Sequence, residues 1–140
     1  IKKKIVEKDE IEKNVRKSLN FGHTFAHAFE GTMGYSKKLN HGEAVLLGIL
    51  AASKFSYKEK LLNSQDFSLI NDHLTELNYY NFKKYFNKNK ISKIIKFMSA
   101  DKKNKGSSIN LVLLKRISKV ILHKEYSKKT ISNFLKNLIN

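Results

Sequence analysis

Apolar side chains recur at helical spacing over most of this chain. Phe21, Phe25 and Phe29 stand four residues apart, which places them on one face and predicts a helix over residues 22–30. Glycine and polar residues interrupt the pattern over residues 31–40 and predict a loop. The first part of the chain with a clear apolar face is therefore a short amphipathic helix.

A second helix is predicted over residues 41–55, where the sequence is apolar on nearly all sides. Asn40 is a favourable N-cap residue, and Glu43 stands three residues later, as a capping box requires. A helix that is apolar all round is expected to be buried. We therefore expect residues 41–55 to form the centre of the domain.

The rest of the pattern predicts a mainly α chain with one hairpin. β-branched runs around a short polar turn predict the hairpin near residues 109–122. The other expected elements are a charged helix over residues 1–18, one or two amphipathic helices within 56–80, a helix over 90–98, and a final helix opening at Ser127 or Thr130. We therefore expect residues 1–140 to form a single, multi-helical domain.

Composition narrows the class of protein. The 140 residues contain no cysteine, which excludes a disulfide scaffold and a thiolate metal site. The longest nearly apolar stretch, residues 44–52, is far shorter than the ~20 residues of a spanning helix. No membrane partner and a cytoplasmic location are expected. Because the chain begins with Ile1, we also expect it to be part of a longer protein.

The net charge of +16 comes from 28 Lys+Arg against 12 Asp+Glu. Arg16 and Arg116 are the only arginines, whereas specific nucleic-acid readers depend on arginine for bidentate contacts. No specific nucleic-acid partner is therefore expected. A lysine-rich, non-catalytic helical binding module remains an alternative, because such a charge attracts acidic partners at low salt.

Three of the five histidines lie within nineteen residues, at positions 23, 27 and 41. His23 and His27 are spaced i, i+4 and share a helix face, so spacing alone allows them to bind one metal ion. His41 begins the next predicted helix and would face the pair if the helices pack antiparallel. The pattern is not HExxH, because Thr24 occupies the glutamate position.

An anion pocket is a further expectation. Arg16 precedes Asn20 by about one helical turn, and His23 or His27 follows within two turns. Together these side chains would line one side of a site for a phosphorylated substrate. The remaining histidines, His73 and His123, are isolated and are expected to be surface residues.

Two long motifs carry a resemblance to a known family. LNFGHTFAHAFE, preceded by Arg16, ends at Glu30, and LNHGEAVLLGI covers residues 39–49. Shorter matches are Lys2 to Val6, residues 9–12 (DEIE), and residues 101–104 (DKKN) followed by the hairpin. With these motifs the chain resembles the C-terminal domain of the 3-dehydroquinate synthase family. One departure is Ala26, where that family usually carries glycine.

The resemblance implies roles for individual residues. His23 and His41 would be metal ligands, and a glutamate outside this chain would be the third. His27 would contact phosphate or transfer a proton, and Glu12 would be an active-site acid that orients the cations. The resemblance also implies a set of residues that hold the substrate: Lys2, Arg16, Asn20, His27 and Lys102. Spacing alone paired His23 with His27, whereas the resemblance pairs His23 with His41.

The family converts 3-deoxy-D-arabino-heptulosonate 7-phosphate to 3-dehydroquinate and phosphate in the shikimate pathway. It uses NAD and a divalent metal, most often zinc, with cobalt as a substitute. The resemblance implies that an N-terminal domain, absent from this chain, binds the NAD, that the full enzyme is a homodimer, and that this chain alone is inactive. Another sugar-phosphate cyclase of the same fold remains an alternative.

Overall fold

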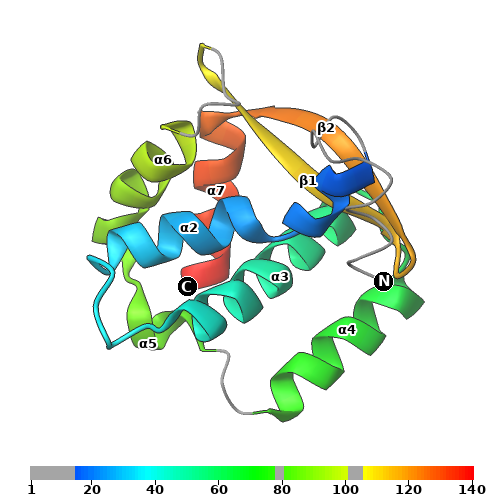
Figure 1. Cartoon of the computed structure of the whole chain (residues 1–140), viewed down its shortest axis with the longest axis horizontal. Coiled ribbons are helices and arrows are strands. Elements are labelled where there is room, and N and C mark those ends of the chain that lie inside the picture. Colours follow the sequence, from blue (N-terminus) through cyan, green and yellow to red (C-terminus); the bar gives the residue numbers. More distant parts are fainter. Residues whose placement is uncertain (1–14, 78–80, 101–105) are drawn as a thin grey trace.

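The fold is taken from a computed structural model that describes residues 15–77, 81–100 and 106–140. Helices pack beside one two-stranded antiparallel sheet (Figure 1). In chain order the elements are η1 (Val15–Asn20), α2 (His23–Thr32), α3 (His41–Lys58), α4 (Ser64–Glu76), α5 (Phe82–Tyr85), η2 (Lys88–Lys90), α6 (Ile91–Ser99), β1 (Ser108–Arg116), β2 (Lys119–Ser127) and α7 (Lys128–Ile139). The mainly α architecture with one hairpin is the one expected from the sequence.

Helices α2 and α3 pack closely and antiparallel at the centre of the molecule (Figure 1). A Cβ atom at Gly48 would lie 2.3 Å from the Gly22 carbonyl oxygen and 2.9 Å from the Ala26 methyl group. Gly22 itself has φ +80°, a left-handed conformation that favours glycine, and it precedes the first residue of α2. The absence of side chains at both glycines allows the two helix backbones to touch.

Helix α3 starts at the predicted residue. The Asn40 side chain accepts a hydrogen bond from the Glu43 backbone N–H at 2.9 Å, and the Asn40 N–H donates to the Glu43 carboxylate at 3.0 Å. The predicted capping box is thus confirmed. The helix continues to Lys58, three residues beyond the predicted end at 55, and nine of its 18 residues are buried.

Aromatic rings join the helices into one core. The Phe134 ring of α7 lies 6.1 Å from Phe25 of α2 and 5.0 Å from Phe55 of α3. Phe29 of α2 contacts Phe86, with 4.9 Å between ring centroids. Edge-on and tilted pairs of this kind add to the free energy of burial. The core therefore fixes α2 from both α7 and the segment around α5.

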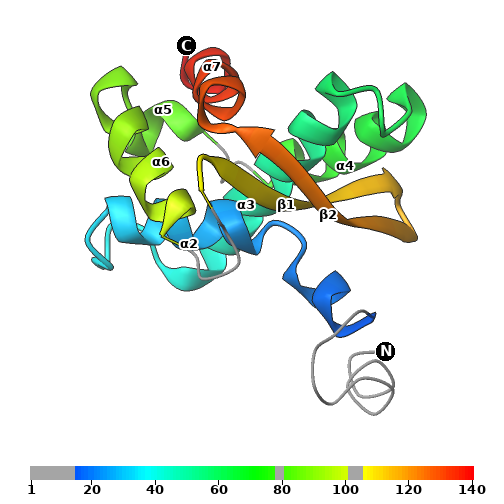
Figure 2. The ribbon, with the colours of Figure 1, turned by 90° about the horizontal axis from the view of Figure 1, so that it is seen from above.

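The hairpin is tied to two helices by side-chain hydrogen bonds. The buried Leu114 N–H donates to Ser56 Oγ of α3 at 3.0 Å, and the Ile117 N–H donates to the Asp66 carboxylate of α4 at 3.2 Å. Figures 1 and 2 both place α4 and α6 at opposite ends of the molecule, with the hairpin running past α3 between them. The sheet thus links the central helices to α4.

Several elements differ from the sequence predictions. The described part of the predicted helix 1–18 is a 3-10 helix that reaches Asn20, and the rest of it lies outside the described residues. In the described part of 56–80, α4 confirms the lower of the two predicted helix numbers, and α3 extends into this segment as far as Lys58. The short elements α5 and η2 were not predicted. The hairpin is longer than 109–122, because its strands pair from Ser108 to Ser127. Within the described residues, no helix has both the length and the apolar character needed to cross a membrane.

Candidate metal and substrate site

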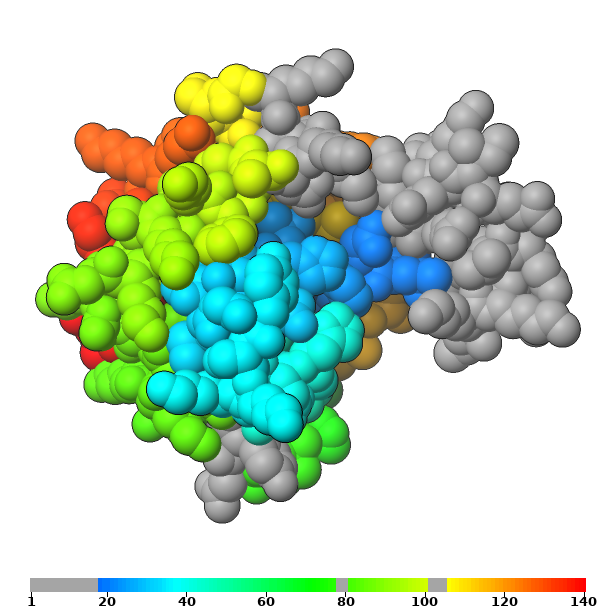
Figure 3. Space-filling model, turned by 60° about the vertical axis from the view of Figure 1, so that its left-hand side comes forward, coloured from blue at the N-terminus to red at the C-terminus, as the bar shows by residue number. Residues whose placement is uncertain are grey.

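One face of α2 carries the chemically useful side chains. His23, His27 and Glu30 are spaced i, i+4, i+7 along the helix and therefore point to the same side. In the space-filling view of Figure 3, α2 lies between α6 and the start of α3. The opposite face of the helix is buried through Phe25 and Phe29. Packing of that apolar face directs the polar face outward.

His41 joins this face from the neighbouring helix. Its Nδ1 lies 2.9 Å from Glu30 Oε1, which connects the first residue of α3 to the last turn of α2. The His41 side chain is 67% exposed, whereas that of Glu30 is only 14% exposed. A largely buried carboxylate therefore holds an exposed imidazole ring.

The His23 ring has a comparable, longer contact. Its Nδ1 lies 3.4 Å from the Phe21 carbonyl oxygen, two residues earlier in the chain. The left-handed Gly22 lies between these two residues and turns the chain into α2. In both His23 and His41, Nδ1 therefore faces an oxygen acceptor and Nε2 remains for another ligand.

The donor chemistry of these two histidines suits a metal ion. Histidines that bind metals usually donate their second ring nitrogen to a carboxylate, a backbone carbonyl or water, which fixes the tautomer and the ring orientation. Two imidazole Nε2 atoms are suitable donors for zinc or cobalt. Among the described residues, no group of three or more His, Cys, Asp or Glu side chains converges to form a complete metal site. A complete site would need a ligand from elsewhere.

His27 lies between the two ends of this face. It is exposed, and its ring contacts the edge of the His23 ring at a centroid distance of 5.6 Å with an interplanar angle of 86°. The exposed ring is accessible to a substrate. Its position one turn from His23 is compatible with a proton-transfer role beside a metal, as well as with the metal pair suggested by spacing alone.

The predicted substrate residues are only partly within the described structure. Asn20 is half-buried at the end of η1, two residues before α2, and Arg16 belongs to the same 3-10 helix. The helix η1 that carries both residues comes directly before α2, which begins at His23. Lys2, Glu12 and Lys102 lie outside the described residues.

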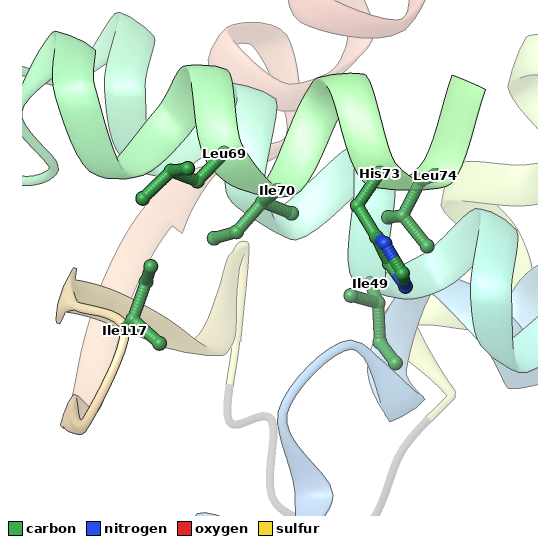
Figure 4. A pocket seen from close by; sticks show the side chains of 6 residues that line it. All are labelled: Ile49, Leu69, Ile70, His73, Leu74 and Ile117. Carbon is green, nitrogen blue, oxygen red and sulfur yellow. The ribbon is translucent and has the colours of Figure 1, made fainter. Parts of the chain in front are cut away.

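A separate cavity of about 290 Å³ opens between α3, α4 and the hairpin turn (Figure 4). Its lining is almost wholly apolar, and it includes none of the side chains of the α2 face. His73, exposed as expected from the sequence, contributes its ring to one wall, and Ile117 lines the cavity from the hairpin turn. This lining offers little to hold a phosphate or a carboxylate.

Glu30 is the site residue that sequence reasoning missed. It ends the motif that carries the family resemblance, yet its partner, His41, is eleven residues away. The sequence signal for Glu30 is its spacing: His23, His27 and Glu30 stand at i, i+4 and i+7, so a helix places all three on one face.

Comparison with known structures identifies the fold. The chain superposes with a TM-score of 0.80 on the crystal structure of 2-deoxy-scyllo-inosose synthase complexed with carbaglucose-6-phosphate, NAD+ and Co2+. The match has 20% sequence identity and covers 97% of this chain and 39% of that one. The chain therefore has the fold of the matched part of that synthase.

Sequence comparison gives the family. Residues 1–104 match the family model described as 3-dehydroquinate synthase C-terminal. The chain is 53% identical over 137 residues to 3-dehydroquinate synthase from Pelagibacter ubique (strain HTCC1062) and 38% identical over 135 residues to the one from Dictyoglomus thermophilum (strain ATCC 35947 / DSM 3960 / H-6-12). These alignments cover 97% and 96% of this chain but 37% of each relative. The chain belongs to the 3-dehydroquinate synthase C-terminal family.

Proposed function

We propose that this chain is the metal- and substrate-binding domain of a 3-dehydroquinate synthase. The reaction would convert 3-deoxy-D-arabino-heptulosonate 7-phosphate to 3-dehydroquinate and phosphate. Family membership supports this assignment, and the observation that carries it is the shared arrangement of His23 and His41. Each has Nδ1 facing an oxygen acceptor, which leaves Nε2 for a metal ion.

The proposed metal is zinc, with cobalt as a substitute, held by His23, His41 and a glutamate outside the chain. When bound, the metal would polarise substrate hydroxyl groups, and NAD would supply transient oxidation of one of them. The structural neighbour, 2-deoxy-scyllo-inosose synthase, was crystallised with both NAD+ and Co2+. This supports NAD and a divalent metal ion as the cofactors here.

The protein side chains would bind and orient an anionic sugar acid. Arg16 and Asn20, which precede α2, would contact substrate oxygens, and His27 would move a proton or contact phosphate from its exposed position. Lys2 and Lys102 would add positive charge, and Glu12 would orient these cations. Two negative groups on the substrate, a carboxylate and a phosphate, match a chain with a net charge of +16.

The rest of the proposed enzyme lies outside these residues. The chain spans 37% of the length of the relatives, which supports an additional N-terminal domain that binds NAD. We infer that residues 1–140 form one domain of a cytoplasmic homodimer, and that this domain alone has no synthase activity.

Phosphate release measures the proposed reaction directly. The chain joined to its NAD-binding domain, with NAD and zinc, is expected to release phosphate from 3-deoxy-D-arabino-heptulosonate 7-phosphate. Glucose 6-phosphate, which has a phosphate but no carboxylate, serves as the comparison substrate. Preference for glucose 6-phosphate would instead assign the chain to another sugar-phosphate cyclase.

A further inference from the structure

We propose that Glu30 is a positioning residue that holds His41 ready to bind the metal. This inference rests on the proposed function, because it assumes that His41 is a metal ligand. The observation is the contact of 2.9 Å between Glu30 Oε1 and His41 Nδ1. A carboxylate in this position accepts the Nδ1 hydrogen, selects the tautomer with Nε2 unprotonated, and makes that nitrogen a stronger electron donor.

The backbone that carries Glu30 is held firmly. Gly31, the next residue, lies so close to the Phe97 ring of α6 that a Cβ atom there would come within 2.7 Å of it. Phe29, the preceding residue, is fully buried. The carboxylate therefore extends from a part of α2 that is packed on α6 and in the core, and its position is set before any metal arrives.

The backbone of His41 is held as well. His41 follows Asn40, whose capping box with Glu43 defines the start of α3. Its ring, however, is 67% exposed and receives little support from packing. Of the described contacts, the one with Glu30 is the interaction that fixes the ring orientation. Without it, rotation of the exposed ring would have to be stopped by the metal itself, at a cost in binding free energy.

A purely structural ion pair is the competing explanation. A pair with one exposed partner contributes little to stability, because solvent screens it. Such a role would appear in the unfolding of the chain and would leave the tautomer and the metal affinity unchanged. The two explanations thus predict different measurements.

The experiment compares Glu30→Ala and Glu30→Gln with the native chain and with Glu76→Ala. Glu76 is an exposed carboxylate at the end of α4 and is the matched control for loss of one negative charge. The first measurement is the tautomer of His41 in the metal-free chain, read from the nitrogen chemical shifts of its imidazole by NMR. The second is a calorimetric zinc titration, with His41→Ala as the reference for complete loss of the ligand.

In the native chain His41 is expected to carry its hydrogen on Nδ1. Glu30→Ala should lose this preference and bind zinc about 10–100-fold more weakly, the usual effect of removing the partner of a metal-binding histidine. Glu30→Gln should keep the tautomer, because the amide oxygen also accepts a hydrogen bond, and should recover part of the affinity. It also serves as the test variant if Glu30→Ala does not fold. Glu76→Ala should match the native chain in both measurements.

The positioning role is wrong if the Glu30 variants keep both the native tautomer of His41 and the native zinc affinity while His41→Ala loses zinc binding. In that case the metal assignment itself would stand. Native zinc affinity in His41→Ala would instead overturn the metal assignment in the proposed function, and the positioning role with it.

Discussion

The carbonyl oxygen of Gly22 and the α-carbon of Gly48 are in direct backbone contact, so close that a Cβ atom at Gly48 would lie 2.3 Å from that oxygen. The same oxygen accepts the hydrogen bond from the Ala26 N–H that starts α2. The crossing of α2 and α3 at this point sets the relative position of the two helices that carry His23 and His41. The methyl group of Ala26, the departure from the family pattern, is fully buried at this crossing, beside Gly48.

Gly48→Ala should therefore destabilise the chain. The new methyl group would meet backbone atoms that cannot rotate away, and overpacking of this kind commonly costs about 1–3 kcal/mol. Urea denaturation measures the free energy of unfolding. Gly42→Ala in the same helix is the control, because its Cβ would meet only Asn40 Oδ1 at an ordinary 3.5 Å. That variant should be unchanged or gain up to ~1 kcal/mol of helix propensity. Equal stability in the two variants would contradict the close crossing.

The chain alone should bind zinc weakly and should not bind NAD. In the proposed site only two imidazole ligands belong to this chain, and the third would come from elsewhere. In calorimetric titrations, His23→Ala and His41→Ala should lose more affinity than the ~10–100-fold that loss of a supporting hydrogen bond causes. His27→Ala should bind nearly as well as the native chain. If His27→Ala is the weakest of the three, the ligands are His23 and His27 instead.

Asn40→Ala should affect both stability and zinc binding. Loss of the N-cap of α3 should lower the free energy of unfolding by about 1 kcal/mol and loosen the backbone at His41, the next residue. Asn63 is the matched control, because its side chain caps α4 by accepting from the Asp66 N–H at 2.8 Å. Asn63→Ala should lower stability similarly and leave zinc affinity unchanged. Equal zinc affinities in the two variants would show that the cap does not support His41.

Tyr126 should titrate at higher pH than ordinary tyrosines. Burial of its phenol raises its pKa from about 10, and the nearby negative charge of Glu59 raises the pKa further. Because the folded pKa exceeds the unfolded one, this group contributes stability below pH ~10 that is lost as the pH rises through the folded value. Absorbance titration of tyrosinate should lose its highest-pH component in Tyr126→Phe. In Glu59→Gln the same component should shift toward lower pH.

Local elements followed from local patterns. The phenylalanines at 21, 25 and 29 predicted α2, and the Asn40–Glu43 pair marked the start of α3, because caps and amphipathic faces depend on residues only three or four apart. The β-branched runs similarly indicated the hairpin. The short helix α5 and the 3-10 segment η2 were missed, since a single turn has too few residues to show a period.

The site shows the same division. Sequence alone named His23, His27 and His41, and helix geometry allowed His23 to pair with either of the other two. The contact between Glu30 and His41 and the close approach of Gly22 to Gly48 arise from the packing of α2 against α3. Such contacts form between residues of separate elements that meet only in the folded structure. The spacing of residues along the sequence does not predict them. The sequence thus determined which residues are candidates for the chemistry, whereas the tertiary structure decided which oxygen each imidazole faces, because that depends on how α2 packs against α3.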